Sequence, residues 1–239
     1  MDAVIMTGGK GTRLAPYTQV LPKGLMPIGG TPLLAHIVRQ LHHYGFTSIT
    51  MACGYLSNLI QAYFMDGSDW GVDIRYVTEA KPLGTVGALK QVEGLDDGFL
   101  VINCDVLTSL NLQEFAEFHR QRGSVLTIAS QQKSIKSSLG VLHIDGEEVV
   151  GFEEKPSHSV HVSMGIYMMS TKVMEMIPDN QFFDVPDLIA ALLRARHPVR
   201  HFENDAYWLD VGTPNDYFTA CEQYEEMAPL LHPGEAYGQ

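Results

Sequence analysis

The first quarter of the chain contains almost no acidic residues. No Asp or Glu occurs from Ala3 to Met65, although the 239 residues include 28 acids and 16 bases and carry a formal charge of −12. The same window holds four bases, namely Lys10, Arg13, Lys23 and Arg39. Carboxylates repel a bound anion, so a segment without them that keeps its cations is suited to binding one. The alternative is that the acids are absent by chance.

Other absences exclude several classes of protein. The sequence has no run of about 18 apolar residues, so we expect no membrane-spanning helix. Its N-terminus lacks the basic start and apolar core of a signal peptide. Nonspecific binding of DNA or RNA needs a cationic surface, which an acidic chain does not offer. Cys53, Cys104 and Cys221 are odd in number and far apart, which predicts reduced thiols. We therefore expect a cytoplasmic protein with no nucleic-acid and no membrane partner.

The first half of the chain alternates between two patterns. Short apolar runs, typical of buried strands, occupy residues 2–6, 48–53, 72–77 and 99–105. Helical patterns follow them at 31–45, 56–66, 85–92 and 112–123. The first of these has Thr31 as a plausible N-cap and Pro32 at the first helical position. Strands that alternate with helices predict βαβ units and a mostly parallel sheet.

The second half follows a different pattern. Strand-like segments with short gaps lie at 124–130, 139–144, 149–154, 162–169 and 199–202, with helical patches near 171–176 and 185–194 and a closing helix over 213–227. We predict an α/β fold with a Rossmann-like mixed, mostly parallel sheet flanked by helices, and additional β-hairpins in the C-terminal half. The sequence has no hexapeptide repeats, so we expect no β-helix domain.

A glycine-rich segment, TGGKGTR, directly follows the first predicted strand. Glycines there would let backbone N–H groups approach a phosphate, while Arg13 and Lys23 supply charge. The P-loop pattern fails because Lys10 is followed by Gly11. The dinucleotide fingerprint fails because Leu14 replaces its third glycine and no acid follows until Asp66. The residues alone leave two readings open, a phosphate loop or a loop whose glycines serve only turns.

A longer pattern fits this segment. GGKGTRLAPYTQVLPKGLMPI, residues 8–28, resembles the signature of the sugar-1-phosphate nucleotidylyltransferases, G-G-x-G-T-R-L-x-P-x-T-x-x-x-P-K-x-L-x-P. Further segments resemble the family in its own order, namely PLGTVGAL (82–89), NCD (103–105), LGV (139–141), EEKP (153–156), SMGIY (163–167) and WLDVGTPNDY (208–217). The resemblance runs from residue 2 to about 226 and is strongest to the mannose-1-phosphate guanylyltransferase-like branch. It implies the nucleotidyltransferase, glycosyltransferase-A-like fold.

The family resemblance implies a reaction and a set of partners. A sugar 1-phosphate attacks the α-phosphorus of a nucleoside triphosphate, and pyrophosphate leaves. One catalytic domain would cover 1–228, with a nucleotide-binding half at about 1–123, a sugar-binding half at about 124–228 and a tail at 229–239. The sequence leaves open whether the protein is a homo-oligomer.

The family resemblance also implies roles for individual residues. Arg13 would steady the pyrophosphate, Lys23 would bridge the α-phosphate and the acceptor phosphate, and Lys155 would clamp the sugar phosphate. Asp105 and Asp210 would hold Mg²⁺ and complete the catalytic set. The implied nucleotide-binding residues are Thr7, Gly8, Gly9, Gly11, Thr12, Arg13, Lys23, Glu79, Pro82, Gly84 and Thr85. The implied sugar-binding residues are Gly140, Glu154, Lys155 and Ser163. On local evidence alone, Asp105 and Asp210 could equally belong to turns.

The sequence favours one pair of substrates. The Glu79 carboxylate could accept from two donors of guanine, which uracil and thymine cannot match, so we predict GTP. The resemblance favours a manno-configured hexose or heptose 1-phosphate. Gly24, Cys104 and Ser163 depart from the family pattern, where proline, a small residue and asparagine are common. Two alternatives stay open. One is a uridylyl-, thymidylyl- or cytidylyltransferase on another sugar phosphate, an amino sugar phosphate or phosphocholine, and the other is a non-catalytic regulator that binds nucleotide sugars.

Overall fold

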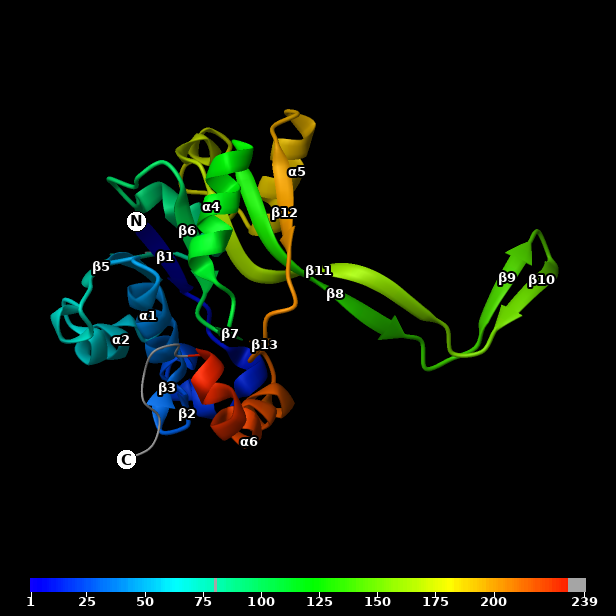
Figure 1. The fold of residues 1–239 in the computed structure, drawn as a ribbon, viewed down its shortest axis with the longest axis horizontal. Coiled ribbons are helices and arrows are strands. Elements are labelled where there is room, and N and C mark those ends of the chain that lie inside the picture. Colours follow the sequence, from blue (N-terminus) through cyan, green and yellow to red (C-terminus); the bar gives the residue numbers. More distant parts are fainter. Residues whose placement is uncertain (80, 232–239) are drawn as a thin grey trace.

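A seven-stranded mixed sheet forms the centre of the protein in the computed structural model, which describes residues 1–79 and 81–231 (Figure 1). The strand order is β12 (Val199–Glu203), β8 (Leu126–Lys136), β11 (Ser157–Met169), β6 (Phe99–Asn103), β1 (Asp2–Thr7), β4 (Ser48–Cys53) and β5 (Asp73–Thr78). Only β11 runs antiparallel to its neighbours. This confirms the predicted α/β fold with a mostly parallel sheet.

Both faces of this sheet are buried. Successive side chains of a strand point to opposite faces, so β1 contributes to two cores. Ala3 and Ile5 belong to a core that includes Leu34, whereas Val4 and Met6 belong to a core that includes Leu188. The helices are α1 (Leu33–His43), α2 (Ser57–Phe64), α3 (Gly84–Gly87), α4 (Leu112–Arg122), α5 (Val185–Arg194) and α6 (Pro214–Leu231). In the part of the chain that the structure describes, none is long and apolar enough to cross a membrane.

Helix boundaries depart from the sequence predictions at three places. Thr31 is not an N-cap, because Thr31–Pro32 form β3, which pairs with β2 (Pro27–Ile28) before α1 begins at Leu33. A residue that precedes proline favours extended backbone, which accounts for this difference. The pattern at 85–92 forms only the short α3 and a 3-10 helix at Ala88–Gln91. Helix α6 continues past residue 227 to Leu231, and residues 232–239 of the predicted tail lie outside the described chain.

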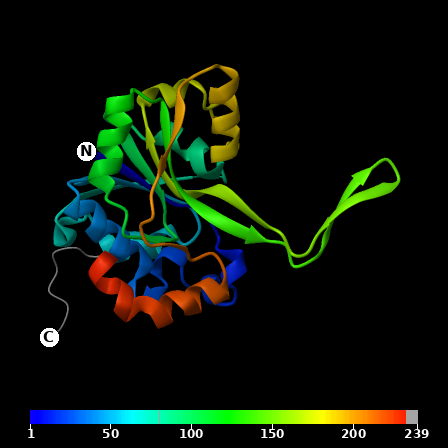
Figure 2. The same cartoon turned by 45° about the vertical axis from the view of Figure 1, so that its right-hand side comes forward.

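Two strands continue far beyond the central sheet. Residues 131–136 of β8 and 157–162 of β11 pair as an antiparallel ribbon, in register from Gln131↔Val162 to Lys136↔Ser157. At the end of the ribbon, β9 (Val141–Asp145) and β10 (Glu148–Glu153) form a separate two-stranded sheet. Figures 1 and 2 show this segment reaching away from all other elements. We call residues 131–162 the arm and the rest of the described chain the body.

Candidate functional site

The predicted nucleotide-binding residues gather around one cavity of about 410 Å³. It lies where β1, β5 and β6 end, and Gly8, Glu79 and Cys104 follow the last strand residues. Ligands of open α/β sheets bind at this edge. The cavity is lined by the predicted residues Gly8, Gly9, Gly11, Thr12, Arg13, Lys23, Glu79, Pro82, Gly84, Thr85 and Asp105, and also by Met6, Asn103, Cys104, Phe182 and Asp184.

The glycine-rich loop packs closely against other side chains at two positions. Gly11 has φ +61°, and a Cβ there would lie 2.9 Å from Cγ2 of Thr18. The Thr18 hydroxyl donates a hydrogen bond to the Gly11 carbonyl at 2.8 Å and holds the loop in place. A Cβ on Gly8 would lie 3.1 Å from Oε1 of Glu79. Gly8, Gly9 and Gly11 line the cavity without side chains, so the loop backbone can approach a ligand there.

Four charged side chains meet beside this loop. Lys23 Nζ lies 2.5 Å from Asp105 Oδ2, with the two side chains only 10% and 19% exposed. The β13 strand (Trp208–Asp210) pairs with β7 (Val106–Thr108) and sets Asp210 opposite Val106, directly after Asp105. Arg13 packs against this strand end, since a Cβ on Gly212 would lie 3.1 Å from Nη2 of Arg13. The structure therefore brings the two cations and two carboxylates together from separate segments of the sequence.

The two carboxylates of this cluster are suitable ligands for Mg²⁺, which prefers oxygen donors. Partial removal from water raises the pKa of Asp210, and the charge of Asp105 raises it further, while Lys23 and Arg13 lower it. In residues 1–79 and 81–231, no group of three or more His, Cys, Asp or Glu could enclose a metal ion. Mg²⁺ usually binds one or two carboxylates together with substrate phosphates rather than a full protein cage. The donor set therefore suits a metal that arrives with a nucleotide.

The loop at 82–87 is fixed by a segment about a hundred residues further along the chain. The Thr85 N–H donates to Asp184 Oδ1 at 2.7 Å, and the Val86 and Gly87 N–H groups donate to the Phe183 carbonyl. Gly84 has φ +76°, and a Cβ there would lie 2.7 Å from Asp184 Oδ1. Sequence reasoning missed Phe182 and Asp184. An Asp before Val-Pro indicates only the cap of the next helix.

Glu79 also contacts the loop at 82–87. Its Oε2 accepts a hydrogen bond from the Leu83 N–H at 2.9 Å. Burial raises the pKa of Glu79, and this hydrogen bond partly opposes the rise. The neighbouring Cys104 also lines the cavity, and burial beside Asp105 raises the pKa of its thiol to about 12. Cys104 is therefore a thiol at neutral pH and no nucleophile.

Besides Asp210, two predicted residues of the body do not line the cavity. The hydroxyl of Thr7 points into the sheet, where it donates to the Ala52 carbonyl at 2.9 Å and lies 3.1 Å from Sγ of Cys53. Ser163 lies at the bulge where β11 enters the central sheet, and its Oγ is 3.1 Å from the hydroxyl of Tyr167. Both side chains already have partners within the protein.

The remaining predicted residues lie on the arm, away from the cavity of their own chain. Gly140, Glu154 and Lys155 belong to the connections between the ribbon and the β9–β10 sheet, and none lines the cavity. Lys155 is exposed, and its Nζ lies 3.9 Å from Glu154 Oε1. The physical reason is that β8 and β11 keep their ladder past the sheet and carry these residues outward (Figures 1 and 2). The structure therefore does not bring these residues to Asp105 within one chain.

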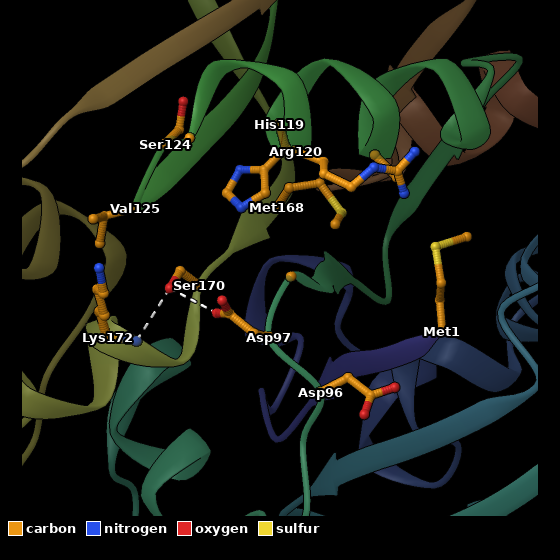
Figure 3. A pocket seen from close by; sticks show the side chains of 13 residues that line it. Met1, Asp96, Asp97, His119, Arg120, Ser124, Val125, Met168, Ser170 and Lys172 are labelled. Atoms are coloured by element: carbon orange, nitrogen blue, oxygen red, sulfur yellow. Dashed lines mark hydrogen bonds between the residues drawn. The ribbon is translucent and has the colours of Figure 1, made fainter.

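A second cavity, of about 320 Å³, lies beside Met1, at the other end of β1 (Figure 3). Its lining mixes charges of both signs, from Asp96, Asp97, Arg120 and Lys172. Asp97 is engaged by the Ser170 hydroxyl and the Thr171 N–H at 2.8 and 3.0 Å. None of the predicted site residues lines this cavity.

Comparison with known proteins relates the chain to enzymes with the predicted chemistry. Residues 2–227 match the family model described as nucleotidyl transferase. The chain is 32% identical to a UTP–glucose-1-phosphate uridylyltransferase of Synechocystis and 33% identical to a mannose-1-phosphate guanylyltransferase of Mycobacterium tuberculosis. These matches cover 92% and 91% of the chain but 62% of each relative.

A solved structure supports the same relationship. HddC from Yersinia pseudotuberculosis, complexed with GMP-PN, has a TM-score of 0.71 at 28% identity, over 93% of this chain and 99% of that one. With the fold, the cavity and the family match over residues 2–227 in agreement, the chain belongs to the nucleotidyl transferase family.

Proposed function

We propose that this protein transfers a nucleoside monophosphate from a nucleoside triphosphate to a sugar 1-phosphate and releases pyrophosphate. The single observation that carries this is that Lys23, Asp105 and Arg13 line one cavity with a glycine-rich loop, and that Asp210 lies close enough to interact with all three charges. A triphosphate placed along the loop would meet both cations. The family match and the names of the relatives support the same reaction.

The reaction does not require the protein to remove a proton from the nucleophile. An oxygen of the sugar 1-phosphate forms a bond to the α-phosphorus, and the bond from that phosphorus to the oxygen bridging it to the β-phosphate breaks. The attacking oxygen is already ionised at neutral pH, so no general base is required. The protein must align two anions and stabilise charge on the α-phosphoryl oxygens. Arg13 is suited to the pyrophosphate side and Lys23 to the α-phosphate.

Magnesium is the metal that we propose for this site. Enzymes of this family generally use divalent metal ions, and Asp105 and Asp210 would hold one here. When bound, Mg²⁺ neutralises phosphate charge and polarises the α-phosphoryl group. In the structure, Lys23 Nζ contacts Asp105 Oδ2 at 2.5 Å. A metal on that carboxylate would compete with the contact and leave the ammonium for a phosphate.

For the nucleotide we propose GTP. The Glu79 carboxylate lies in the cavity at the end of β5 and uses Oε2 for the Leu83 N–H. Guanine offers an N1–H and an exocyclic amine as a pair of donors, and a carboxylate can accept both. The relatives use UTP in one case and act as guanylyltransferases in others, so the base is the finer part of the proposal.

For the acceptor we propose a manno-configured hexose or heptose 1-phosphate, because several relatives are mannose-1-phosphate guanylyltransferases. The place of action that we propose is the cytoplasm, since all three cysteines are free, as expected in a reducing compartment. The competing candidate is uridylyl transfer to glucose 1-phosphate, which the Synechocystis relative favours.

The test is Mg²⁺-dependent release of pyrophosphate from GTP, UTP, CTP, dTTP and ATP, each combined with a panel of sugar 1-phosphates. We expect release with GTP and a manno-configured acceptor. Release with UTP and glucose 1-phosphate instead would replace the proposed substrates and keep the reaction. Folded protein that binds no triphosphate in the presence of Mg²⁺ would refute the reaction.

A further inference from the structure

Among the residues that the structure describes, Phe182 is the one aromatic side chain that lines the cavity of the glycine-rich loop. Phe182 is 62% exposed, whereas the next residue, Phe183, is partly buried and packs against the core that includes Leu188. A single exposed phenylalanine elsewhere on the surface would need no explanation. In the wall of a polar cavity, however, its ring is an apolar surface that a bound ligand can cover.

The backbone next to Phe182 is bonded to the loop at 82–87. The Phe183 N–H donates to the Leu83 carbonyl at 2.8 Å, and the Phe183 carbonyl accepts from the Gly87 N–H at 2.9 Å. Both polar backbone groups of Phe183 are therefore used by one loop. The position of the neighbouring Phe182 is fixed relative to that loop by these bonds.

Two glycines of the loop allow this close contact. A Cβ on Gly84 would lie 2.8 Å from the Phe183 carbonyl oxygen, and a Cβ on Gly87 would lie 2.9 Å from the Gln181 carbonyl oxygen. These two oxygens belong to the residues on either side of Phe182. Because the contacts are made by backbone atoms, a side chain at either glycine would force the segments apart. Phe182 and the loop thus form one preorganised wall of the cavity, which lowers the entropy cost of binding a ligand there.

The contacts of this wall distinguish it from the charged part of the lining. Arg13 and Lys23 are the cations that would meet the phosphates of a nucleoside triphosphate. Glu79 accepts a hydrogen bond from the Leu83 N–H at 2.9 Å, so it contacts the same loop as the Phe182 segment. A triphosphate bound by the two cations would therefore place its base beside Glu79 and Phe182.

Glu79 and Phe182 are suited to different parts of a base. A carboxylate accepts hydrogen bonds from donors at the edge of the base, and so it discriminates between bases. A phenyl ring packs on the face of the base, and every base has such a face. The aromatic side chain would therefore supply affinity for any base, whereas the carboxylate would select among bases.

We propose that Phe182 stacks on the base of the bound nucleoside triphosphate and supplies much of the affinity for the nucleoside half of that substrate. The proposal rests on the proposed function for the identity of the ligand, but it does not depend on the choice of GTP over UTP. Phe182 acts in binding and takes no part in the transfer of the phosphoryl group.

Calorimetry with the Mg²⁺ complexes of GTP, UTP and tripolyphosphate tests the proposal, because tripolyphosphate has the phosphates without a base. Phe182→Ala should raise the Kd of each nucleotide that the wild type binds by roughly 5- to 150-fold, and should leave binding of tripolyphosphate unchanged. Phe218→Ala, at an exposed position of α6 outside the cavity lining, is the matched control and should bind like the wild type. An unchanged nucleotide Kd in Phe182→Ala, or an equal loss of tripolyphosphate binding, would overturn the proposal.

Phe182→Trp tests the stacking itself. This variant should keep the affinity for GTP, and GTP should quench its fluorescence beyond the change seen in the wild type, which contains Trp70 and Trp208. Tripolyphosphate should cause no such additional quenching, and its absence with GTP would overturn the proposal. A wild type that binds GTP but transfers no nucleotide would refute the proposed function and leave the stacking intact. A wild type that binds no nucleoside triphosphate would refute both.

Discussion

The cavity and the arm carry the two halves of the predicted site, but they are held in opposite ways. The cavity joins segments far apart in the chain through buried or partly buried contacts, such as Lys23 with Asp105 and Thr85 with Asp184. Within the described residues, the arm contacts the body only near its base, as in His161 with Glu203, and beyond that it is held by its own ladder, with Leu142 and Phe152 exposed at the tip. The comparison teaches that the predicted nucleotide-binding residues are held together within the body, whereas Gly140, Glu154 and Lys155 lie on the arm, away from the cavity.

The largest effect should come from breaking the charged cluster of the cavity. Asp105→Asn and Lys23→Ala should each lower kcat by about 100- to 1000-fold, as loss of one preorganised transition-state contact does. Pyrophosphate release measures this, with circular dichroism as the check on folding. The control is Asp145→Asn, an exposed acid at the arm tip, which should keep full activity. Near-normal rates in the two cavity variants would contradict the assignment.

A smaller effect should come from the arm, and it should concern binding of the sugar 1-phosphate. Lys155→Ala should raise KM for the sugar 1-phosphate by about tenfold or more, as expected for a lost hydrogen bond between charged groups. The dissociation constant of GTP, measured by calorimetry, should not change. Lys136→Ala, another exposed arm lysine, is the matched control. Weaker binding of GTP in Lys155→Ala would contradict the assignment of GTP to the cavity and the sugar 1-phosphate to the arm.

Within the cavity, Glu79 should set the choice of base. Glu79→Gln should lower the preference for GTP over UTP by about tenfold, because an amide cannot accept from both donors of guanine. Burial raises the pKa of Glu79, so in the wild type this preference should fall with decreasing pH from a higher pH than an ordinary glutamate would allow. In the variant the preference should not depend on pH over that range. Unchanged preference in Glu79→Gln would exclude this role.

The smallest effect should distinguish the structural role of Thr7 from the nucleotide-binding role of Thr12. Thr7→Val removes the hydrogen bond to the Ala52 carbonyl and should cost about 1 kcal/mol of unfolding free energy, without weakening GTP binding. Thr12→Val, at an exposed position of the cavity lining, should weaken GTP binding without lowering the unfolding free energy. Urea unfolding and calorimetry measure the two quantities. Weaker GTP binding in Thr7→Val would return Thr7 to the nucleotide site.

Local sequence patterns predicted the fold well where each element is buried. The apolar runs at β1, β4 and β6 and the stripe of α1 determine their own burial, so the parallel sheet followed from them. The glycine loop came from a long motif and the carboxylates Asp105 and Asp210 from two further motifs, all through the family resemblance. The roles of Phe182 and Asp184 depend on a contact with residues 82–87 that no local pattern encodes. The arm could not be predicted either, because strand patterns do not reveal where a ladder leaves its sheet.

The most direct test of the central claim is ³¹P NMR of one reaction mixture, with GTP, mannose 1-phosphate, Mg²⁺ and the wild-type protein. The account predicts that the phosphomonoester signal and the triphosphate signals decline together, while a sugar diphosphate ester and pyrophosphate appear in equal amounts. The same mixture with Asp105→Asn should stay unchanged. Release of inorganic phosphate with an intact sugar phosphate would mean that the cavity hydrolyses nucleotides and does not join them to sugars, and would contradict the account.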